Sequence, residues 1–387
     1  VQHHCAGAVS AATLKPEYPS LARAKPVEVM QLIRSENVGP ATFFKLVSYF
    51  GSVVAALEGA PELSVKGGRK RPITIASAQQ AKDELEKVEA FGAEIILYGS
   101  TLYPAMLHTI HDPPPLLMCL GHASIWSRSY NIGMVGARNA SANGCRFARQ
   151  LAHDLGKLDV TVISGLARGI DANAHTGALP YGTVGVIAGG IDSIYPPENA
   201  GLYEQMREQG AIISEQPFGS APQQRNFPAR NRIISGMSHG IVVVEASLKS
   251  GSLITAKQAA DQNREVFAVP GSPMDPRNKG SNQLIRDGAH LLESASDVLP
   301  HMPRKTDGAF EAPAQDFAPT PIQPPSEPEL VKARQTVLEK LGVEPVLVDE
   351  LLTQCQLTPN VMLTVLLELE LAGRLQRYPG NRVSVLL

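Results

Sequence analysis

The sequence predicts an α/β protein whose core is an extended Rossmann-like domain with a parallel sheet. A helical domain is expected before this core, and a winged-helix domain after it. Two observations predict the core: short apolar runs that end in glycine or another small residue, and segments with apolar residues at helical spacing after these runs. Repeated strand–turn–helix units produce right-handed crossovers and a parallel sheet. Because the runs are continuously apolar, both faces of the sheet should be covered.

Composition narrows the class of protein. The 387 residues allow two or three domains and a sizeable core. The formal net charge of −2 argues against a basic nucleic-acid coat, so any anion site must be a local patch. The four cysteines form no CxxC pair, which argues against a zinc ribbon or a disulfide framework and fits a reducing cytoplasm. No apolar run approaches the ~20 residues of a membrane span.

Residues 1–24 are expected to be a disordered flank. Their first part has neither an initiator methionine nor a clean signal peptide. His3 and His4 lie in this flank, so a disordered terminus is a better interpretation of them than a metal site, and no metal is predicted.

A helical domain is predicted at residues 25–101. Its NVGP turn, residues 37–40, precedes an apolar helix and resembles a helix-hairpin-helix or sterile-alpha-motif-like unit. In a DNA-binding hairpin, such a glycine turn presents backbone N–H groups to a phosphate. Few cations lie nearby, and Phe43, Phe44 and Phe50 look like core residues. A packing or dimer role is therefore favoured over DNA contact.

The Rossmann-like domain is predicted at residues 102–302. Strands are expected at 130–137, 160–165, 183–190, 211–215, 241–246 and 266–271. Helices are expected at 145–158, 167–179, 202–209 and 255–262. The remaining segment, NFPARNRIISG at 226–236, contains two arginines around Asn231 and runs into an expected small-residue turn at 235–240.

Cations follow several of the predicted strands. Arg138 follows the first strand, Arg168 lies in the turn after the second, and Arg230 and Arg232 precede the strand at 241–246. Ligands of open parallel sheets lie outside the carboxyl ends of the strands, where glycine permits close approach and helix N-termini add partial positive charge. The turns match neither GxGxxG nor GxxxxGK[ST], so no dinucleotide or P-loop cofactor is predicted. Together these turns predict an anion site.

Catalysis at this site is the alternative hypothesis. Glu245 ends a predicted strand, as a carboxylate does in nucleotide-cleaving Rossmann-like enzymes. Asp171 and His175 are four residues apart on a predicted helix and share a face. Neither arrangement has an obvious nucleophile or partner carboxylate. Binding without catalysis is favoured over a nucleotide- or phosphoribosyl-cleaving enzyme, and a protein-interaction scaffold with a vestigial pocket is a third possibility.

A linker is predicted at residues 303–328, where seven prolines lie. A winged-helix domain is predicted at residues 329–387, with three helices followed by a hairpin. Its third helix is apolar and acidic, whereas a reader of the major groove needs basic and amide side chains. A winged helix that binds protein, or that binds DNA poorly, is therefore favoured, although Arg374, Arg377 and Arg382 in the wing keep DNA binding open.

The central sequence resembles the DNA-processing protein A (DprA/Smf) family. The resemblance covers residues 102–292 nearly continuously and rests on LYPAMLHTIHDPPPLL, MVGARNAS, VISGLARGIDANAH, VIAGGIDSIYPPEN, GAIISEQPFG, NFPARNRIISGMSHGIVVVEA, SGSLITAKQAADQNREVFAVPG and KGSNQLIRDGAHLL.

The resemblance implies a cytoplasmic, homodimeric mediator that binds single-stranded DNA. Such a mediator protects incoming DNA during natural transformation and loads RecA onto strands covered by single-strand-binding protein. The implied contacts of the family's positive pocket are Arg138, Arg168, Arg230, Asn231, Arg232 and Lys257, with backbone approach at Gly136, Ser164 and Gly165, and stacking by Phe227. For Phe227 a core position is an equal alternative. A dimer surface near residues 285–292 is a suggestion only.

Overall fold

The structure is a computed structural model that describes residues 18–303, 325–378 and 381–386. Most of the expected flank, and the linker from residue 304 to 324, lie outside these described residues. The end of the flank is ordered, however, because the Tyr18 hydroxyl donates to the His111 carbonyl at 2.7 Å and Leu21 is buried. The chain forms two compact units: residues 1–22 with 83–307, and residues 23–82 with 308–387.

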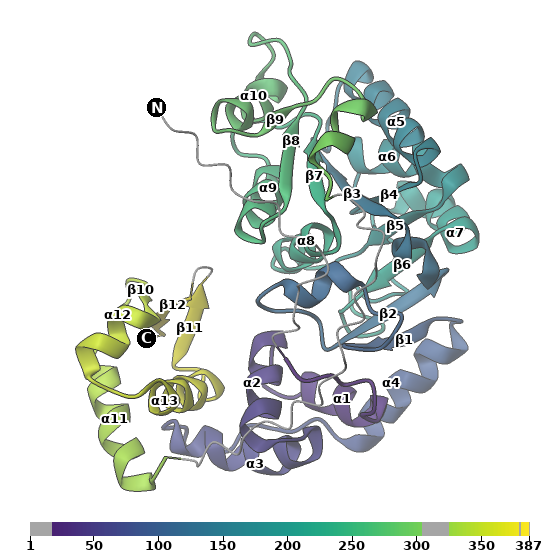
Figure 1. The fold of residues 1–387 in the computed structure, drawn as a ribbon. Helices are drawn as coiled ribbons and strands as arrows, with labels where there is room; N and C mark the ends of the chain where they lie inside the picture. The colour runs from purple at the N-terminus through teal and green to yellow at the C-terminus, as the bar shows by residue number, and fades with distance from the viewer. Residues whose placement is uncertain (1–17, 304–324, 379–380, 387) are drawn as a thin grey trace. The chain divides into compact units, whose positions relative to one another are not determined.

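The first unit contains a nine-stranded sheet in the order β1-β2-β6-β5-β4-β3-β7-β8-β9 (Figure 1). Its strands are β1 (Glu94–Leu97), β2 (Leu116–Gly121), β3 (Tyr130–Val135), β4 (Val160–Ser164), β5 (Thr183–Val186), β6 (Ala211–Ser214), β7 (Gly240–Val243), β8 (Glu265–Ala268) and β9 (His290–Leu291). The strands from β6 to β9 run parallel, which confirms the predicted parallel core.

The edge formed by β1 and β2 was not predicted. Both strands pair antiparallel, β1 with β2 and β2 with β6. Because β1 lies before residue 102, the expected boundary at residue 101 falls inside the sheet. The sheet unit begins earlier than that expectation, at residue 83.

Helices cover both faces of the sheet. The helices α5 (Ala142–Lys157), α6 (Ile170–Ala178) and α7 (Ala200–Gln209) lie on one face, and α8 (Asn226–Met237) and α9 (Gly251–Asp261) on the other (Figure 1). The chain leaves β3 through β4 and β5 to β6, and then returns to add β7 on the other side of β3. Right-handed crossovers in these opposite directions place the helices on opposite faces. The helix α10 (Lys279–Arg286) follows β8, and α4 (Ala78–Ala90) spans the division between the units.

The core under α5 and α6 follows from the sequence pattern. Leu151 and Leu155 lie one turn apart on α5 and are buried against Ile132, Val162 and Val242 of the sheet. Full burial of each such side chain contributes about 1.5–3 kcal/mol. This packing sets the positions of the loops at the ends of the strands.

Segment 226–237 is helical, which corrects the small-residue turn expected at 235–240. The helix α8 continues through Ser235 and Gly236 and ends at Met237. Gly236 is favourable there because a Cβ would lie 2.7 Å from Leu107 Cδ1, so glycine allows close packing. Tertiary packing therefore outweighs the weak helix propensity of these small residues.

The second unit combines the N-terminal helices with a winged-helix domain. It contains α1 (Pro26–Ile33), α2 (Pro40–Phe50), α3 (Val53–Lys66), α11 (Glu327–Lys340), β10 (Val346–Leu347), α12 (Val348–Cys355), α13 (Pro359–Leu371), β11 (Leu375–Tyr378) and β12 (Arg382–Val385). The three strands pair in the order β10-β12-β11. The predicted helical and winged-helix domains are thus both confirmed as folds.

In the described ranges no single helix has the length and apolarity to cross a membrane. The pair α2 and α3 passes that test only together, with a bend of 102° between its members.

Candidate nucleic-acid interface

The candidate site lies at the carboxyl edge of the parallel strands. β4 and β7 flank β3 on opposite sides, so the chain direction switches at this point. Open α/β sheets bind ligands at such switch points. Two adjoining cavities of about 380 Å³ and about 580 Å³ open here. Both cavities are lined by Arg138, Asn139, Ala167, Phe227 and Arg230.

Arg230 is the buried cation of the site. It extends from α8 and is 5% exposed, and its Nη1 donates to the Val186 carbonyl at 3.0 Å. Its Nε has no hydrogen-bond partner among the described residues. A Cβ at Gly165, directly after β4, would lie 1.5 Å from Arg230 Nη1. Only glycine at residue 165 therefore leaves room for this guanidinium.

Charges around Arg230 are only partly compensated. Burial lowers the pKa of Arg230 to about 10, although nearby Asp171 opposes the shift. The guanidinium therefore stays protonated at neutral pH. Burial raises the pKa of Asp171, while Arg230 and the amides of Ala167 and Gly165 oppose this shift. A buried cation with an unbonded N–H favours an anionic ligand that accepts a hydrogen bond.

An aromatic ring faces the cavities beside this cation. Phe227 is half-buried and lines both cavities, so its ring is directed to the site and not into the core. The guanidinium carbon of Arg138 lies 4.9 Å from the centroid of this ring. The Tyr195 ring lies 6.0 Å from Phe227 and lines the smaller cavity. Charge and aromatic surface thus occur together at the opening.

The other expected contacts divide into two groups. Arg168 is exposed, lines the smaller cavity with Gly165 and forms an ion pair with Glu198. Gly136 and Asn231 line the larger cavity. The remaining three do not line either cavity: Ser164, Arg232 and Lys257.

Each of these three residues has a separate explanation. The Ser164 hydroxyl is buried and donates to the Met134 carbonyl at 2.5 Å. Lys257 is exposed on α9. Arg232 is buried in ion pairs with Asp112 at 3.1 Å and Glu215 at 2.5 Å.

The position of Arg232 follows from helix geometry. Arg230 and Arg232 are two residues apart on α8. In a helix of 3.6 residues per turn, residues i and i+2 are rotated by about 200° around the helix axis. Their side chains therefore extend from opposite faces of the helix. The two arginines therefore do not form one wall of the site.

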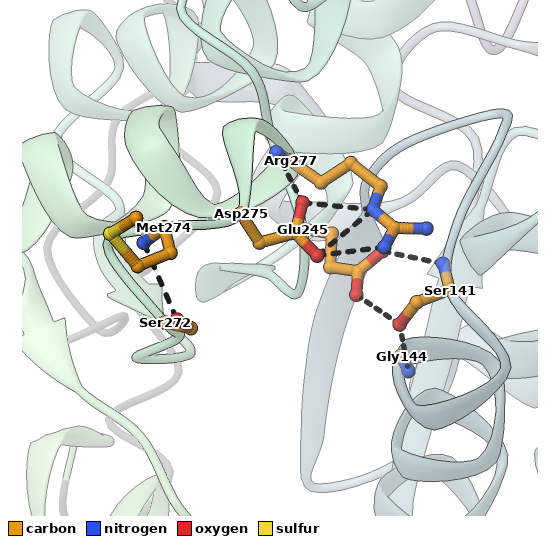
Figure 2. A network of polar contacts seen from close by, with 7 residues as sticks. All are labelled: Ser141, Gly144, Glu245, Ser272, Met274, Asp275 and Arg277. Atoms are coloured by element: carbon orange, nitrogen blue, oxygen red, sulfur yellow. Dashed lines mark hydrogen bonds and ion pairs between the residues drawn. The ribbon is translucent and has the colours of Figure 1, made fainter.

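Glu245 holds the loop that carries Arg138 (Figure 2). Its carboxylate accepts hydrogen bonds from the Ser141 amide at 2.8 Å and from the Ser141 hydroxyl at 2.5 Å. The Ser141 hydroxyl in turn accepts from the Gly144 amide at 2.9 Å and caps α5. Both carboxylate oxygens are thus engaged with the loop.

The Asp171 and His175 pair is also explained by local structure. His175 Nδ1 lies 2.8 Å from Thr183 Oγ1 in the interior. Burial lowers the pKa of His175 to about 3, so the imidazole is neutral at physiological pH. Asp171 instead accepts hydrogen bonds from the Gly165 and Ala167 amides.

Arg277 is a cation of the site that the sequence analysis missed. It lines the larger cavity together with Ser250 and Ser252 at the start of α9. Figure 2 shows its guanidinium paired with Asp275, with an Nη2–Oδ2 distance of 2.7 Å. The loop after β8 contains no repeated pattern, so only the folded chain places Arg277 here.

Neither a metal site nor a disulfide is apparent in the ranges that the structure describes. No group of three or more His, Cys, Asp and Glu residues there could hold a metal ion. Cys119, Cys145 and Cys355 are free thiols.

Three family models match this chain. The DNA recombination-mediator protein A model matches residues 94–303, the DprA-like N-terminal HHH domain matches residues 23–86, and the DprA winged helix domain matches residues 321–381.

Individual proteins and a solved structure are also similar. The DNA processing protein DprA of Bacillus subtilis is 43% identical over 55% of this chain and 73% of its own length. Protein Smf of Synechocystis sp. is 36% identical over 90% of this chain and 95% of its own length. The X-ray structure of DNA processing protein A from Streptococcus pneumoniae is 30% identical, with a TM-score of 0.59, and the match covers 71% of this chain and 96% of that chain.

Proposed function

Because the chain belongs to the DNA recombination-mediator protein A family, we propose that it binds single-stranded DNA in the two cavities at the carboxyl edge of its sheet. The protein holds the strand and does not cleave it. The observation that carries this proposal is the buried Arg230 guanidinium, with its unbonded Nε, beside the exposed Arg138 and the half-buried Phe227.

The chemistry of these groups suits a single strand. A recessed cation needs a phosphate that can enter the cavity, and a flexible single strand can bend to supply one. An aromatic ring at the opening needs an unstacked base, which a single strand also supplies. Contacts to phosphate and to the face of a base carry little sequence information, so binding should tolerate many sequences.

Several finer roles belong to the same proposal. The strand that this protein covers is incoming DNA during natural transformation, and RecA is loaded onto it in the cytoplasm in place of single-strand-binding protein. The protein acts as a homodimer, since two cavities on one strand raise avidity without new contacts. The surface near residues 285–292 is proposed for that dimer. β9 is the last strand of the sheet, with Leu291 49% exposed, and an edge strand can pair with another chain.

A titration at two salt concentrations tests the proposal. The protein is titrated into labelled single-stranded and double-stranded oligonucleotides, followed by fluorescence anisotropy. Arg138→Ala should weaken single-strand binding about tenfold and reduce the salt slope by about 0.7, as expected for one lost phosphate contact.

Lys157→Ala is the matched control. Lys157 is an exposed cation in the last turn of α5, at the end opposite the loop that carries Arg138. Its removal changes the net charge equally and should leave affinity unchanged. Equal effects of the two variants, or a preference of the native protein for duplex, would contradict the proposed site.

A further inference from the structure

The third helix of the winged-helix domain is buried on nearly all sides. In α13, every residue from Val361 to Leu369 is buried except Leu363, which is 53% exposed. A helix that reads DNA must present one polar face to a groove. A helix that is covered all round is instead an internal element of a larger unit.

Two different partners cover α13. The core of the winged-helix domain contains Val361, Met362, Val365, Leu366 and Leu369. A second set of α13 residues is buried outside that core, at the helical spacing i, i+3, i+4, i+7: Thr364, Leu367, Glu368 and Leu371. The helices α2 and α3 of the N-terminal domain pack against α13. Of this second set, Glu368 pairs its carboxylate with Arg334 of α11, while its backbone carbonyl faces Gly67 after α3. The second stripe therefore lies where α13 meets both α11 and the N-terminal helices.

Glu370 is a polar anchor of this contact. Its carboxylate accepts hydrogen bonds from Thr42 Oγ1 at 2.9 Å and Lys45 Nζ at 3.2 Å, both on α2. Arg377 Nε of the wing adds a third bond at 2.9 Å. Burial acts to raise the pKa of Glu370, because it disfavours the charged carboxylate. The positive charges of Lys45 and Arg377 have the larger effect and hold the pKa below its ordinary value.

Backbone groups in the last turn of α13 extend the contact. Asn37 Nδ2, in the turn before α2, donates to the Leu371 carbonyl at 3.1 Å. A Cβ at Gly67, after α3, would lie 2.0 Å from the Glu368 carbonyl oxygen, so the two backbones touch. Arg374 Nη1 lies 3.5 Å from the Gly67 carbonyl. Two wing arginines that kept DNA binding open in the sequence, Arg374 and Arg377, are thus directed to this interface.

We propose that α13 is a docking face by which the winged-helix domain binds the N-terminal helices of the same chain. The partner is the surface formed by α2 and α3, and the Thr42–Lys45–Glu370 contact selects it. The winged helix then serves protein contact within the molecule, and α13 is not available to a DNA groove while the two domains are docked.

A cleavable linker tests whether the docking persists without the covalent connection. A protease site is inserted into residues 304–324 of the full chain, and the cleaved protein is analysed by gel filtration. The C-terminal fragment should remain bound to the rest. Glu370→Gln should weaken that retention roughly a hundredfold, because it removes the carboxylate that pairs with half-buried Lys45 and Arg377. Retention that is unchanged in this variant, or complete release of the fragment from the native protein, would overturn the proposal.

Two controls separate docking from folding. Glu344→Gln alters an exposed acid of the winged-helix domain and should leave retention unchanged. Thr42→Val removes the hydroxyl from the opposite side of the interface and should also weaken retention, even if Glu370→Gln unfolds its own domain.

Zero-length carbodiimide cross-linking of the intact chain is the second measurement. It should join Lys45 to Glu370, since their side chains form an ion pair at 3.2 Å. A mixture of ¹⁴N- and ¹⁵N-labelled protein distinguishes the source of the contact. If every cross-linked peptide pair carries a single isotope, the two domains dock within the same chain. Cross-linked pairs that combine both isotopes would show docking between two copies and would overturn the proposal.

Discussion

Gly165→Ala should remove the central cation of the site while leaving the fold intact. The new Cβ would lie 1.5 Å from Arg230 Nη1, so the guanidinium must leave its position. The atoms that have to move are the far end of a flexible side chain, which keeps the structural cost low. Gly165 has an ordinary negative φ, so alanine introduces no backbone strain of the left-handed kind.

The expected loss follows from the displaced hydrogen bonds. A hydrogen bond to a charged group contributes about 1.5–3 kcal/mol, which corresponds to roughly ten- to a hundredfold in affinity. The bond from Nη1 to the Val186 carbonyl is also lost, so the guanidinium can no longer meet a phosphate in the same place. Single-strand affinity should therefore fall by this factor on all sequences.

Anisotropy titrations with two unrelated oligonucleotide sequences measure the effect, with thermal unfolding monitored in parallel. Gly201→Ala in α7 is the control, because a Cβ there meets no atom within 4 Å. Native affinity in a folded Gly165→Ala protein would refute the assignment of Arg230 as a DNA contact. A loss confined to one oligonucleotide sequence would refute contact through phosphate.

Two further predictions concern stability. Arg232→Ala should lower the free energy of unfolding by about 3–5 kcal/mol, because Glu215 and Asp112 lose their buried cation. Urea unfolding measures this loss, and a binding defect in folded Arg232→Ala protein, without a stability defect, would show that Arg232 faces the DNA after all. The second prediction is that stability falls with acidification through His175, whose pKa drops from 6.5 to about 3 on burial. The folded state binds fewer protons than the unfolded state in this window, so the contribution is complete above pH 6.5 and declines as the pH falls towards 3. From pH 6.5 to pH 5 the free energy of unfolding should fall by about 2 kcal/mol. Urea unfolding at both pH values measures this fall, which should be smaller in His175→Gln than in the native protein. An equal fall in the two proteins would assign the pH dependence to other groups.

Local pattern was sufficient for much of the site. The apolar runs place the strands, and glycines such as Gly165 mark where the backbone must leave space beside a strand end. The carboxyl ends of parallel strands meet at one edge whatever the details of packing. For that reason Arg138 and Arg230 could be grouped from the sequence, whereas Phe227 was implied only by the family resemblance. The structure brings these three together around the same cavities.

The predictions were wrong where the orientation of a side chain depended on a helix or strand that was not predicted. The segment containing Arg230 and Arg232 was not identified as a helix, and helical rotation sends Arg232 to Glu215 instead of the cavity. Arg277 lies in a short 3₁₀ helix, Pro276–Asn278, which no sequence pattern marked and which lines the larger cavity only in the folded chain. β1 and β2 were missed as an antiparallel edge because β2 joins the sheet by pairing with β6, which lies far along the chain, and β1 pairs only with β2.

The sequence by itself determined the alternating strands and helices of the parallel core and the edge at which an anion site would form. These features depend on periodicity and on glycine, which act over a few residues. Only the tertiary structure decided which cations face that site, that Glu245 holds the Arg138 loop, and that α13 contacts helices more than 300 residues earlier in the chain. The position of each charged side chain depends on the cost of removing its charge from water and on the energy gained when it pairs with an opposite charge. The residues that form such pairs are distant in sequence and meet only in the folded chain.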